Sequence, residues 1–92
     1  MGNPVCIVTG ATGGIGQQIV LDFAKQGYDV VINYSKNETS ALALSEQCKG
    51  LGVQTLVLGF DVSNSADVET NIKKVVETFG RIDVLINNSG IT

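Results

Sequence analysis

Several residue types are scarce or absent in this chain of 92 residues, and two of these absences exclude a class of function. There is no histidine and no tryptophan, and the two cysteines, Cys6 and Cys48, lack the close spacing of a metal-binding motif. Six Lys and Arg stand against nine Asp and Glu, which gives a net charge of -3. The basic residues are scattered, so no basic stripe is present for a nucleic-acid backbone. We therefore expect no metal site and no nucleic-acid partner.

Long hydrophobic runs are also lacking. The longest apolar stretches have the length of buried strands, so we expect no membrane partner, and no signal-peptide pattern is present. Apolar residues still make up 43% of the chain and charged residues only 16%, the balance of a globular protein. No linker divides the chain, so residues 1–92 are expected to form a single nucleotide-binding domain. Cys6 and Cys48 suit buried positions in a reducing compartment, which predicts a cytoplasmic location.

The chain does contain a regular alternation of strand-length apolar runs and helix-length amphipathic segments. Strands of a parallel sheet that is covered on both faces are nearly continuous apolar runs, rich in β-branched residues. Such runs occupy residues 4–9, 30–34, 54–60 and 82–87. Helices are predicted between them, at 14–26, about 38–51 and about 64–79, and the last carries an apolar stripe of Val68, Ile72, Val75, Val76 and Phe79. The order βαβαβαβ predicts an α/β fold with a Rossmann-like, doubly wound parallel sheet.

Small and polar residues mark the ends of the predicted helices. Gly27, Gly52 and Gly80 are expected just past the three helix ends, where the left-handed conformation is favoured. Asn37 and Ser63 are expected to cap the N-termini of the second and third helices.

The stretch VTGATGGIG, residues 8–16, lies between the first predicted strand and the first predicted helix. Glycine there allows a tight turn, a close approach of the backbone to a pyrophosphate, and close packing of the new helix against the sheet. The helix N-terminus then offers free N–H groups and the positive end of its dipole to the phosphates. The pattern predicts a dinucleotide-binding turn, and the alternative is a glycine-rich turn without a ligand. A P-loop is excluded because no Gly-Lys-Ser or Gly-Lys-Thr follows.

With this turn the chain resembles the amino-terminal half of the short-chain dehydrogenases/reductases. The glycines fit the TGxxxGxG of the family's classical branch through Gly10, Gly14 and Gly16. They fit the TGxxGxxG of the extended branch equally well, through Gly10, Gly13 and Gly16. The glycines alone therefore leave the branch open.

Two later motifs resemble those of the classical branch. Asp61-Val62 is similar to the pair that meets adenine, and Asn87-Asn88-Ser89-Gly90 is similar to NNAG, with Ser89 in place of the usual Ala. In NNAG the first Asn ties the central sheet together, and the next residues border the ribose on the nicotinamide side. The resemblance also implies the strand order 3-2-1-4.

The stretches FAKQGYDVVINYSKNE, DVSNSADV and VVETFGRIDVLINNSGIT are most similar to the ketoreductases of bacterial fatty-acid synthesis. This resemblance implies hydride transfer from NADPH to a 3-oxoacyl thioester, with acyl carrier protein as a partner of the full-length enzyme. Together with the turn and the strand ends, it predicts that a dinucleotide contacts Gly10, Thr12, Gly13, Gly14, Ile15, Gly16, Asn33, Tyr34, Ser35, Lys36, Asp61, Val62, Asn88, Ser89 and Gly90.

The end of the second predicted strand bears on which dinucleotide binds. An acidic residue about 20 residues beyond the glycines would bond the ribose 2′-OH of NAD. This chain has NYSK at residues 33–36, with no carboxylate before Glu38. Hydroxyl and amide donors and Lys36 can bind a 2′-phosphate, which favours NADP(H) over NAD(H). The alternatives are an ordinary solvated lysine for Lys36 and a helix-capping turn residue for Asp61.

The catalytic residues of the family are not found in these 92 residues. Its chemistry uses a Tyr-x-x-x-Lys pair with a Ser and an Asn, and the tyrosine donates a proton to the carbonyl. Four residues after Tyr28 and Tyr34 stand Ile32 and Glu38, so neither tyrosine forms the pair. We expect no catalytic residue in this chain and no activity of the isolated chain, which would be the cofactor-binding portion of a reductase.

The last predicted strand is expected at the edge of the sheet. Val84, Leu85 and Ile86 would be bare there, and the single helix on the second face would leave part of the sheet uncovered. A long apolar edge invites pairing with another chain. We expect this edge to join a missing carboxyl-terminal half or a second copy of the chain. The alternative function is a non-enzymatic half-fold module that binds a nucleotide or self-associates.

Overall fold

The computed structural model describes residues 2–88, in which strands and helices alternate as predicted. Every boundary lies within two residues of its predicted position. The elements are β1 (Val5–Thr9), α1 (Gly14–Lys25), β2 (Asp29–Tyr34), α2 (Glu38–Gly50), β3 (Thr55–Gly59), α3 (Ser65–Phe79) and β4 (Val84–Asn87).

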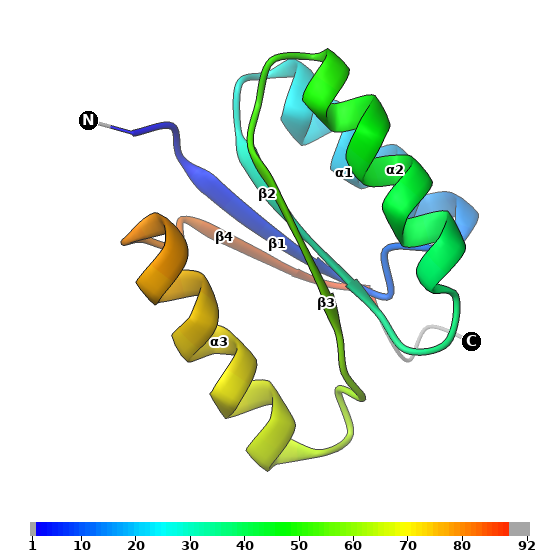
Figure 1. The fold of residues 1–92 in the computed structure, drawn as a ribbon, viewed down its shortest axis with the longest axis vertical. Coiled ribbons are helices and arrows are strands. Elements are labelled where there is room, and N and C mark those ends of the chain that lie inside the picture. Colours follow the sequence, from blue (N-terminus) through cyan, green and yellow to red (C-terminus); the bar gives the residue numbers. More distant parts are fainter. Residues whose placement is uncertain (1, 89–92) are drawn as a thin grey trace.

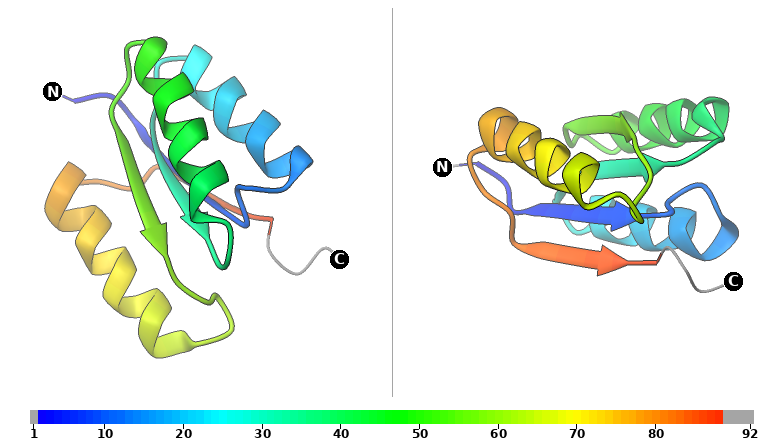
Figure 2. Two further views of the ribbon diagram at one scale, coloured as in Figure 1. Left: turned by 45° about the vertical axis from the view of Figure 1, so that its right-hand side comes forward. Right: turned by 90° about the horizontal axis from the view of Figure 1, so that it is seen from below.

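The four strands form one parallel sheet in the order β3-β2-β1-β4, which confirms the predicted fold class and strand order. Ile7 in the middle of β1 pairs with Val31 on β2 and with Leu85 on β4. Helices α1 and α2 cover one face of the sheet, and α3 covers the other (Figure 1 and Figure 2). Because all strands are parallel, their carboxyl ends meet at one edge, where ligands of such sheets bind.

The larger apolar cluster holds α1 and α2 against the sheet. Val8 and Ile32 from the strands and Val20 and Leu44 from the helices are each at most 1% exposed. Cys6 and Cys48 are buried in the same cluster as free thiols. Burial raises the pKa of the Cys6 thiol to about 12, so this cysteine packs as a small neutral hydrophobic residue.

The second cluster lies under α3. Val75 is fully buried there, but Val76, expected on the same stripe, is 47% exposed. The expectation for Val76 is wrong because the stripe that contacts the sheet runs through Ile72, Val75 and Phe79. Asn71 takes a buried place one turn before Val75, and its Nδ2 donates 2.7 Å to the carbonyl of Asp67, which satisfies that amide group.

Glycine and asparagine residues mark the helix ends. Gly27, Gly52 and Gly80 have φ values of 92°, 90° and 78°, so all three predicted left-handed positions are confirmed. The side chain of Asn37 accepts from the Ser40 N–H and caps α2, as predicted.

The prediction that Ser63 caps α3 is wrong. Asn64 is the cap, and its Oδ1 accepts from the Asp67 N–H at 3.2 Å. The Ser63 hydroxyl instead donates 2.7 Å to Asp61, so the loop places the next residue at the helix start.

Strand β4 lies at one edge of the sheet, as predicted, but it is less bare than expected. Leu85 is 57% exposed, whereas Val84 and Ile86 are half-buried against the larger cluster. Alternation along a strand explains the difference, since neighbouring side chains point to opposite faces. Leu85 points to the α3 face, which a single helix covers incompletely.

Asp83 ties the amino ends of β4 and β1 together. Its Oδ2 accepts from the Val5 N–H at 2.8 Å, and its carboxylate forms two hydrogen bonds with Arg81, at 2.7 and 2.8 Å. Arg81 and the Val5 N–H hold the pKa of Asp83 below its ordinary value. This carboxylate therefore connects the start of β4 to the start of β1.

The substitution Asp83→Asn is expected to lower the thermal unfolding midpoint at neutral pH. Because the folded-state pKa of Asp83 is depressed, its carboxylate stabilises the fold above the ordinary pKa of 3.8 and loses this contribution as the pH falls through the folded pKa. The difference in midpoint between wild type and D83N should therefore be constant at about pH 6 to 7 and shrink below about pH 4. Glu77→Gln on the exposed face of α3 is the matched control. A difference that does not vary with pH, or an equal loss in E77Q, would contradict this account.

Candidate functional site

The predicted glycine-rich turn joins the carboxyl end of β1 to α1, and its glycines serve different purposes. Gly10 has a φ of 60°, in the left-handed region that glycine adopts without strain. A Cβ on Gly16 would lie 2.6 Å from the Gly10 carbonyl oxygen and 2.8 Å from the Cα of Ala11, so the helix packs closely only because no side chain is there. An added Cβ would meet open space at Gly14, and only the Gly10 carbonyl oxygen, at 4.0 Å, at Gly13. Gly10 and Gly16 therefore build the turn, and Gly13 and Gly14 leave room in front of the helix.

The N-terminus of α1 has no side-chain cap. Its N-cap is Gly13, and no acidic residue stands in the first turn, whereas Asn37 and Asn64 cap α2 and α3. The first N–H groups of such a helix have no intrahelical partner, and the dipole adds positive charge there. Thr12 is half-buried beside this end, and Ile15 is 69% exposed in its first turn. The arrangement is suited to a phosphate group, with an apolar side chain next to it.

Asn33 at the carboxyl end of β2 holds the turn in place. It is 1% exposed, and its Oδ1 accepts from the Gly10 N–H at 3.0 Å. Its main-chain carbonyl accepts from the Ala11 N–H at 2.9 Å, and its Nδ2 donates to the Phe60 carbonyl at 3.1 Å. The structure thus places this predicted site residue as a buried support that connects the ends of β1, β2 and β3.

Tyr34 is the last residue of β2, and its ring is fixed from two sides. Its hydroxyl donates 2.8 Å to Oε2 of Glu38, and this hydrogen bond is the main reason that the pKa of Tyr34 is raised. The ring lies over Gly59 on β3, where an added Cβ would come within 2.5 Å of the tyrosine Cζ. Sequence reasoning missed Glu38 and Gly59. The spacing of four residues between Tyr34 and Glu38 at a helix start is the signal that could have found the first.

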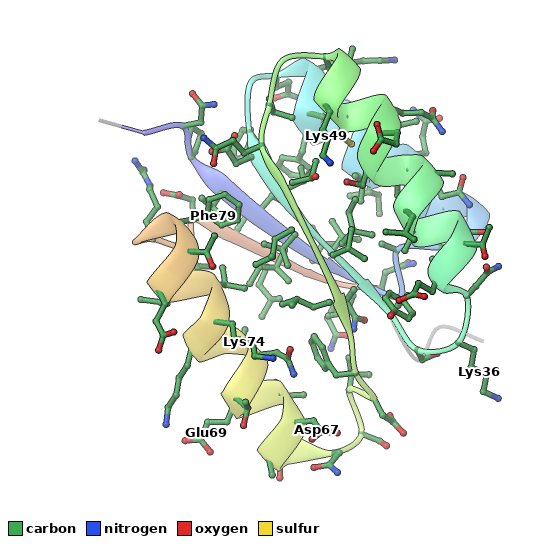
Figure 3. The ribbon with its side chains drawn as sticks, in the orientation of Figure 1. Lys36, Lys49, Asp67, Glu69, Lys74 and Phe79 are labelled. Carbon is green, nitrogen blue, oxygen red and sulfur yellow. The ribbon has the colours of Figure 1, made fainter. Side chains whose placement is uncertain are left out.

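Ser35 and Lys36 follow Tyr34 and are exposed. Figure 3 shows the Lys36 side chain pointing away from the body of the protein. Its charge nevertheless helps to lower the pKa of Asp61.

Asp61 and Val62 follow β3 and begin the loop to α3. Asp61 accepts from the Ser63 N–H at 2.9 Å and from its hydroxyl at 2.7 Å. These two bonds, and then the charge of Lys36, hold the pKa of Asp61 below its ordinary value. Asp61 is therefore ionised at neutral pH and closes a turn before α3, while its side chain stays exposed.

The two asparagines of the NNSG motif, Asn87 and Asn88, meet the glycine-rich turn at the end of β4. Oδ1 of Asn87 accepts from the Thr9 hydroxyl at 3.0 Å, so the first Asn of the motif joins β4 to β1. Asn88 donates its N–H to Thr9 Oγ1 and its Nδ2 to the Gly10 carbonyl, both at 3.1 Å. Ser89 and Gly90 lie outside the described residues.

The predicted residues that are described thus lie along the carboxyl edge of the sheet, and contact with a dinucleotide stays a prediction for each of them. A hollow of about 140 Å³ opens beside this edge on the α3 face, next to Thr9, Val62 and Asn87. Small-molecule pockets measure roughly 300 to 1,000 Å³, so this hollow has room for only part of a dinucleotide. Residues 2–88 contain no cluster of Cys, Asp or Glu that could hold a metal ion. No helix in this part of the chain is long and apolar enough to cross a membrane.

Comparison with known sequences gives a consistent result. A family model described as short chain dehydrogenase matches residues 4–92. A 3-oxoacyl-[acyl-carrier-protein] reductase from Staphylococcus epidermidis is 42% identical over 90 residues, which cover 98% of this chain and 37% of that relative. The protein of the same name from Staphylococcus aureus is 43% identical over 86 residues, which cover 94% of this chain and 35% of the relative. The chain therefore spans little more than a third of the length of these relatives.

Solved structures agree with the fold. A protein from Burkholderia xenovorans described as a short-chain dehydrogenase/reductase matches all of this chain with a TM-score of 0.92 and 36% identity, over 38% of its own length. A protein from Burkholderia cenocepacia described as a dehydrogenase, solved with bound NADP, matches 94% of this chain with a TM-score of 0.88 and 25% identity, over 34% of its own length.

The glycine roles predict a contrast between two similar substitutions. Gly16→Ala is expected to destabilise the fold by about 1 to 3 kcal/mol, because its Cβ collides with backbone atoms of Gly10 and Ala11. Gly14→Ala should leave stability unchanged or raise it by up to about 1 kcal/mol, because its Cβ enters open space and alanine favours the helix. Urea denaturation measures both. Equal effects of the two substitutions would show that close packing at Gly16 is not what requires glycine there.

Proposed function

Because the chain belongs to the short-chain dehydrogenase family, we propose that it is the dinucleotide-binding portion of an NADP(H)-dependent ketoreductase. The observation that carries this proposal is the uncapped N-terminus of α1, with Gly13 and Gly14 exposed in front of it. A pyrophosphate there would accept hydrogen bonds from the first-turn N–H groups and meet no side chain on these glycines. The exposed Ile15 would lie against an apolar part of the ligand.

The remaining predicted residues divide the work of binding. Asp61 and Val62 would meet the adenine, and Ser35 and Lys36 would meet a 2′-phosphate, which supports NADP(H) over NAD(H). Asn33 and Asn88 would act through the turn, since both bond Gly10. The Burkholderia cenocepacia neighbour with bound NADP supports the same choice.

We propose a 3-oxoacyl thioester carried by acyl carrier protein as the substrate of the whole protein, on the names of the Staphylococcus relatives. The bound dinucleotide supplies the hydride. Residues 1–92 carry no Tyr-x-x-x-Lys pair, so their own part is to bind and orient the dinucleotide, and the 92-residue chain alone is proposed to have no reductase activity. The two buried free thiols, Cys6 and Cys48, support a cytoplasmic location.

Fluorescence titration of the folded chain with NADPH and with NADH tests dinucleotide binding, and substitution of Gly13 locates it. Gly13 has φ −74° and ψ 163°, the conformation of an N-cap residue, so Gly13→Asp should cap α1 without strain and keep or slightly raise stability. Its carboxylate would occupy the phosphate position, so we expect at least about a tenfold loss of affinity for both dinucleotides. Gly13→Asn is the matched neutral cap and should lose less. Saturable binding that G13D leaves unchanged would place the ligand elsewhere, and no binding by the folded wild type would contradict the proposal.

A second candidate function, self-association, is favoured by the 57% exposure of Leu85 on the edge strand β4. Burial of this side chain and pairing of the free strand edge would both stabilise a dimer.

Sedimentation velocity at micromolar concentration tests this candidate. We expect a dimer for the wild type and a monomer for Leu85→Lys, because a charge on β4 would have to be buried on association. Leu42→Lys is the control, because Leu42 is 51% exposed on α2, far from β4 in the chain. A wild-type monomer, or equal dissociation by both substitutions, would contradict self-association through β4.

A further inference from the structure

We propose that Glu38, acting with Tyr34, is a specificity-determining residue that favours a ribose with a free 2′-OH and so limits the preference for NADP(H). The inference rests on the proposed function, because it concerns the same binding edge. As the sequence shows, no carboxylate stands between the end of β2 and Glu38. The first carboxylate after the strand is Glu38, and the fold brings it back to the last strand residue.

The contacts of Tyr34 define what its hydroxyl can offer a ligand. The hydroxyl donates its single proton to Glu38 Oε2 over 2.8 Å, so its remaining capacity is to accept. Gly59 on β3 leaves the space that the ring occupies, because a Cβ there would lie 2.5 Å from the tyrosine Cζ. The raised pKa of Tyr34 agrees with this arrangement, since a neighbouring carboxylate disfavours the phenolate.

A ribose 2′-OH and a 2′-phosphate present opposite chemistry to this pair. The 2′-OH can donate a hydrogen bond to the tyrosine oxygen or to the carboxylate. In NAD-binding sites of this fold, the 2′-OH bonds an acidic residue in the same way. A phosphate group offers only acceptor oxygens and carries close to two negative charges. It would be repelled by the lone pairs of the Tyr34 oxygen and by the negative charge of Glu38. In a parallel sheet of this kind, an acidic group at the end of the second strand lies where the ribose is expected.

The charges along the edge point the same way. Lys36 can bind a 2′-phosphate. Glu38 is a carboxylate two residues further along the chain, and Asp61 is a second carboxylate at the same edge of the sheet. A 2′-phosphate would gain one cation and meet the carboxylate of Glu38 as well. The net preference is then set by the balance of Lys36 against Glu38, and removal of Glu38 should shift it toward NADP(H).

The test measures dissociation constants for NADPH and NADH on the wild type and three conservative variants. Glu38→Gln should raise the affinity for NADPH about tenfold and change that for NADH by less than about threefold, since it removes one charge near the phosphate. Tyr34→Phe should weaken NADH about three- to tenfold through loss of one hydrogen bond, with little change for NADPH. Glu46→Gln removes an exposed carboxylate farther along α2, and should change neither.

A second measurement tests the contact itself without a ligand. In a Tyr28→Phe background Tyr34 is the only tyrosine, and its ionisation can be followed by ultraviolet absorbance. Adding Glu38→Gln is expected to lower the pKa of Tyr34 toward its ordinary value, because the main cause of its rise is removed.

The outcomes separate the two proposals. If the wild type binds both dinucleotides and Glu38→Gln leaves their ratio unchanged, or if the pKa of Tyr34 does not respond, this inference is overturned and the proposed function stands. If the folded wild type binds neither dinucleotide, both are overturned. A tenfold gain for NADPH in E38Q, with none in E46Q, supports the inference.

Discussion

The hydrogen bonds of one buried side chain, Asn33, fix the carboxyl edge of this sheet. Its amide is shared between the Gly10 N–H on the turn after β1 and the Phe60 carbonyl after β3. A buried amide that loses a partner costs about 1 to 3 kcal/mol, so both loops are held to one arrangement. Asn88 completes this arrangement from β4 by donating to the Gly10 carbonyl. The turn is therefore fixed from two neighbouring strands, and the start of α1 is placed by them rather than by its own sequence.

That constraint explains how α1 can begin without a cap. An N-cap side chain is worth about 0.5 to 2 kcal/mol, and α2 and α3 each have one. Helix α1 has no such cap. It is stabilised instead by the burial of Val20 and Ala24 and by the close packing of its Gly16 against the turn. A departure from a local rule that is offset by packing is typical of a functional site. The packing of α1 thus offsets the stability that the free N–H groups at its start cost.

The elements and their order could be predicted because each is signalled locally. Continuous apolar runs gave the four strands, and glycines that need a positive φ gave the helix ends. The wrong predictions concern residues whose burial or capping role depends on their neighbours in space. Val76 is exposed because the stripe of α3 that contacts the sheet runs through Ile72 and Val75 instead. Asn71 is buried because its amide bonds a carbonyl of its own helix. Asn64 caps α3 in place of Ser63, because the Ser63 hydroxyl donates a hydrogen bond to Asp61.

The candidate site divides in the same way. Its glycines, Asp61 and the NNSG motif are sequence patterns, but the contact of Tyr34 with Glu38 and Gly59 joins a strand end, a helix start and a neighbouring strand. Gly59 carries no side chain, so only the pairing of β2 with β3 shows that the tyrosine ring needs its space. Sequence motifs of this kind indicate the class of ligand that a family binds, whereas the contact of Tyr34 with Glu38 is proposed to influence which dinucleotide fits.

Strand β4 connects the exposed edge of the sheet with the candidate site. It is an edge strand with Leu85 exposed, and it also carries Asn87 and Asn88, which bond Thr9 and the Gly10 carbonyl. An edge strand is held from one side only, so its ends open more readily than those of a central strand. Any opening of β4 would remove Asn88 from the turn and loosen the start of α1. A chain that covers Leu85 would therefore also stabilise the start of α1, where phosphate binding is proposed, although it touches neither Gly13 nor Gly14.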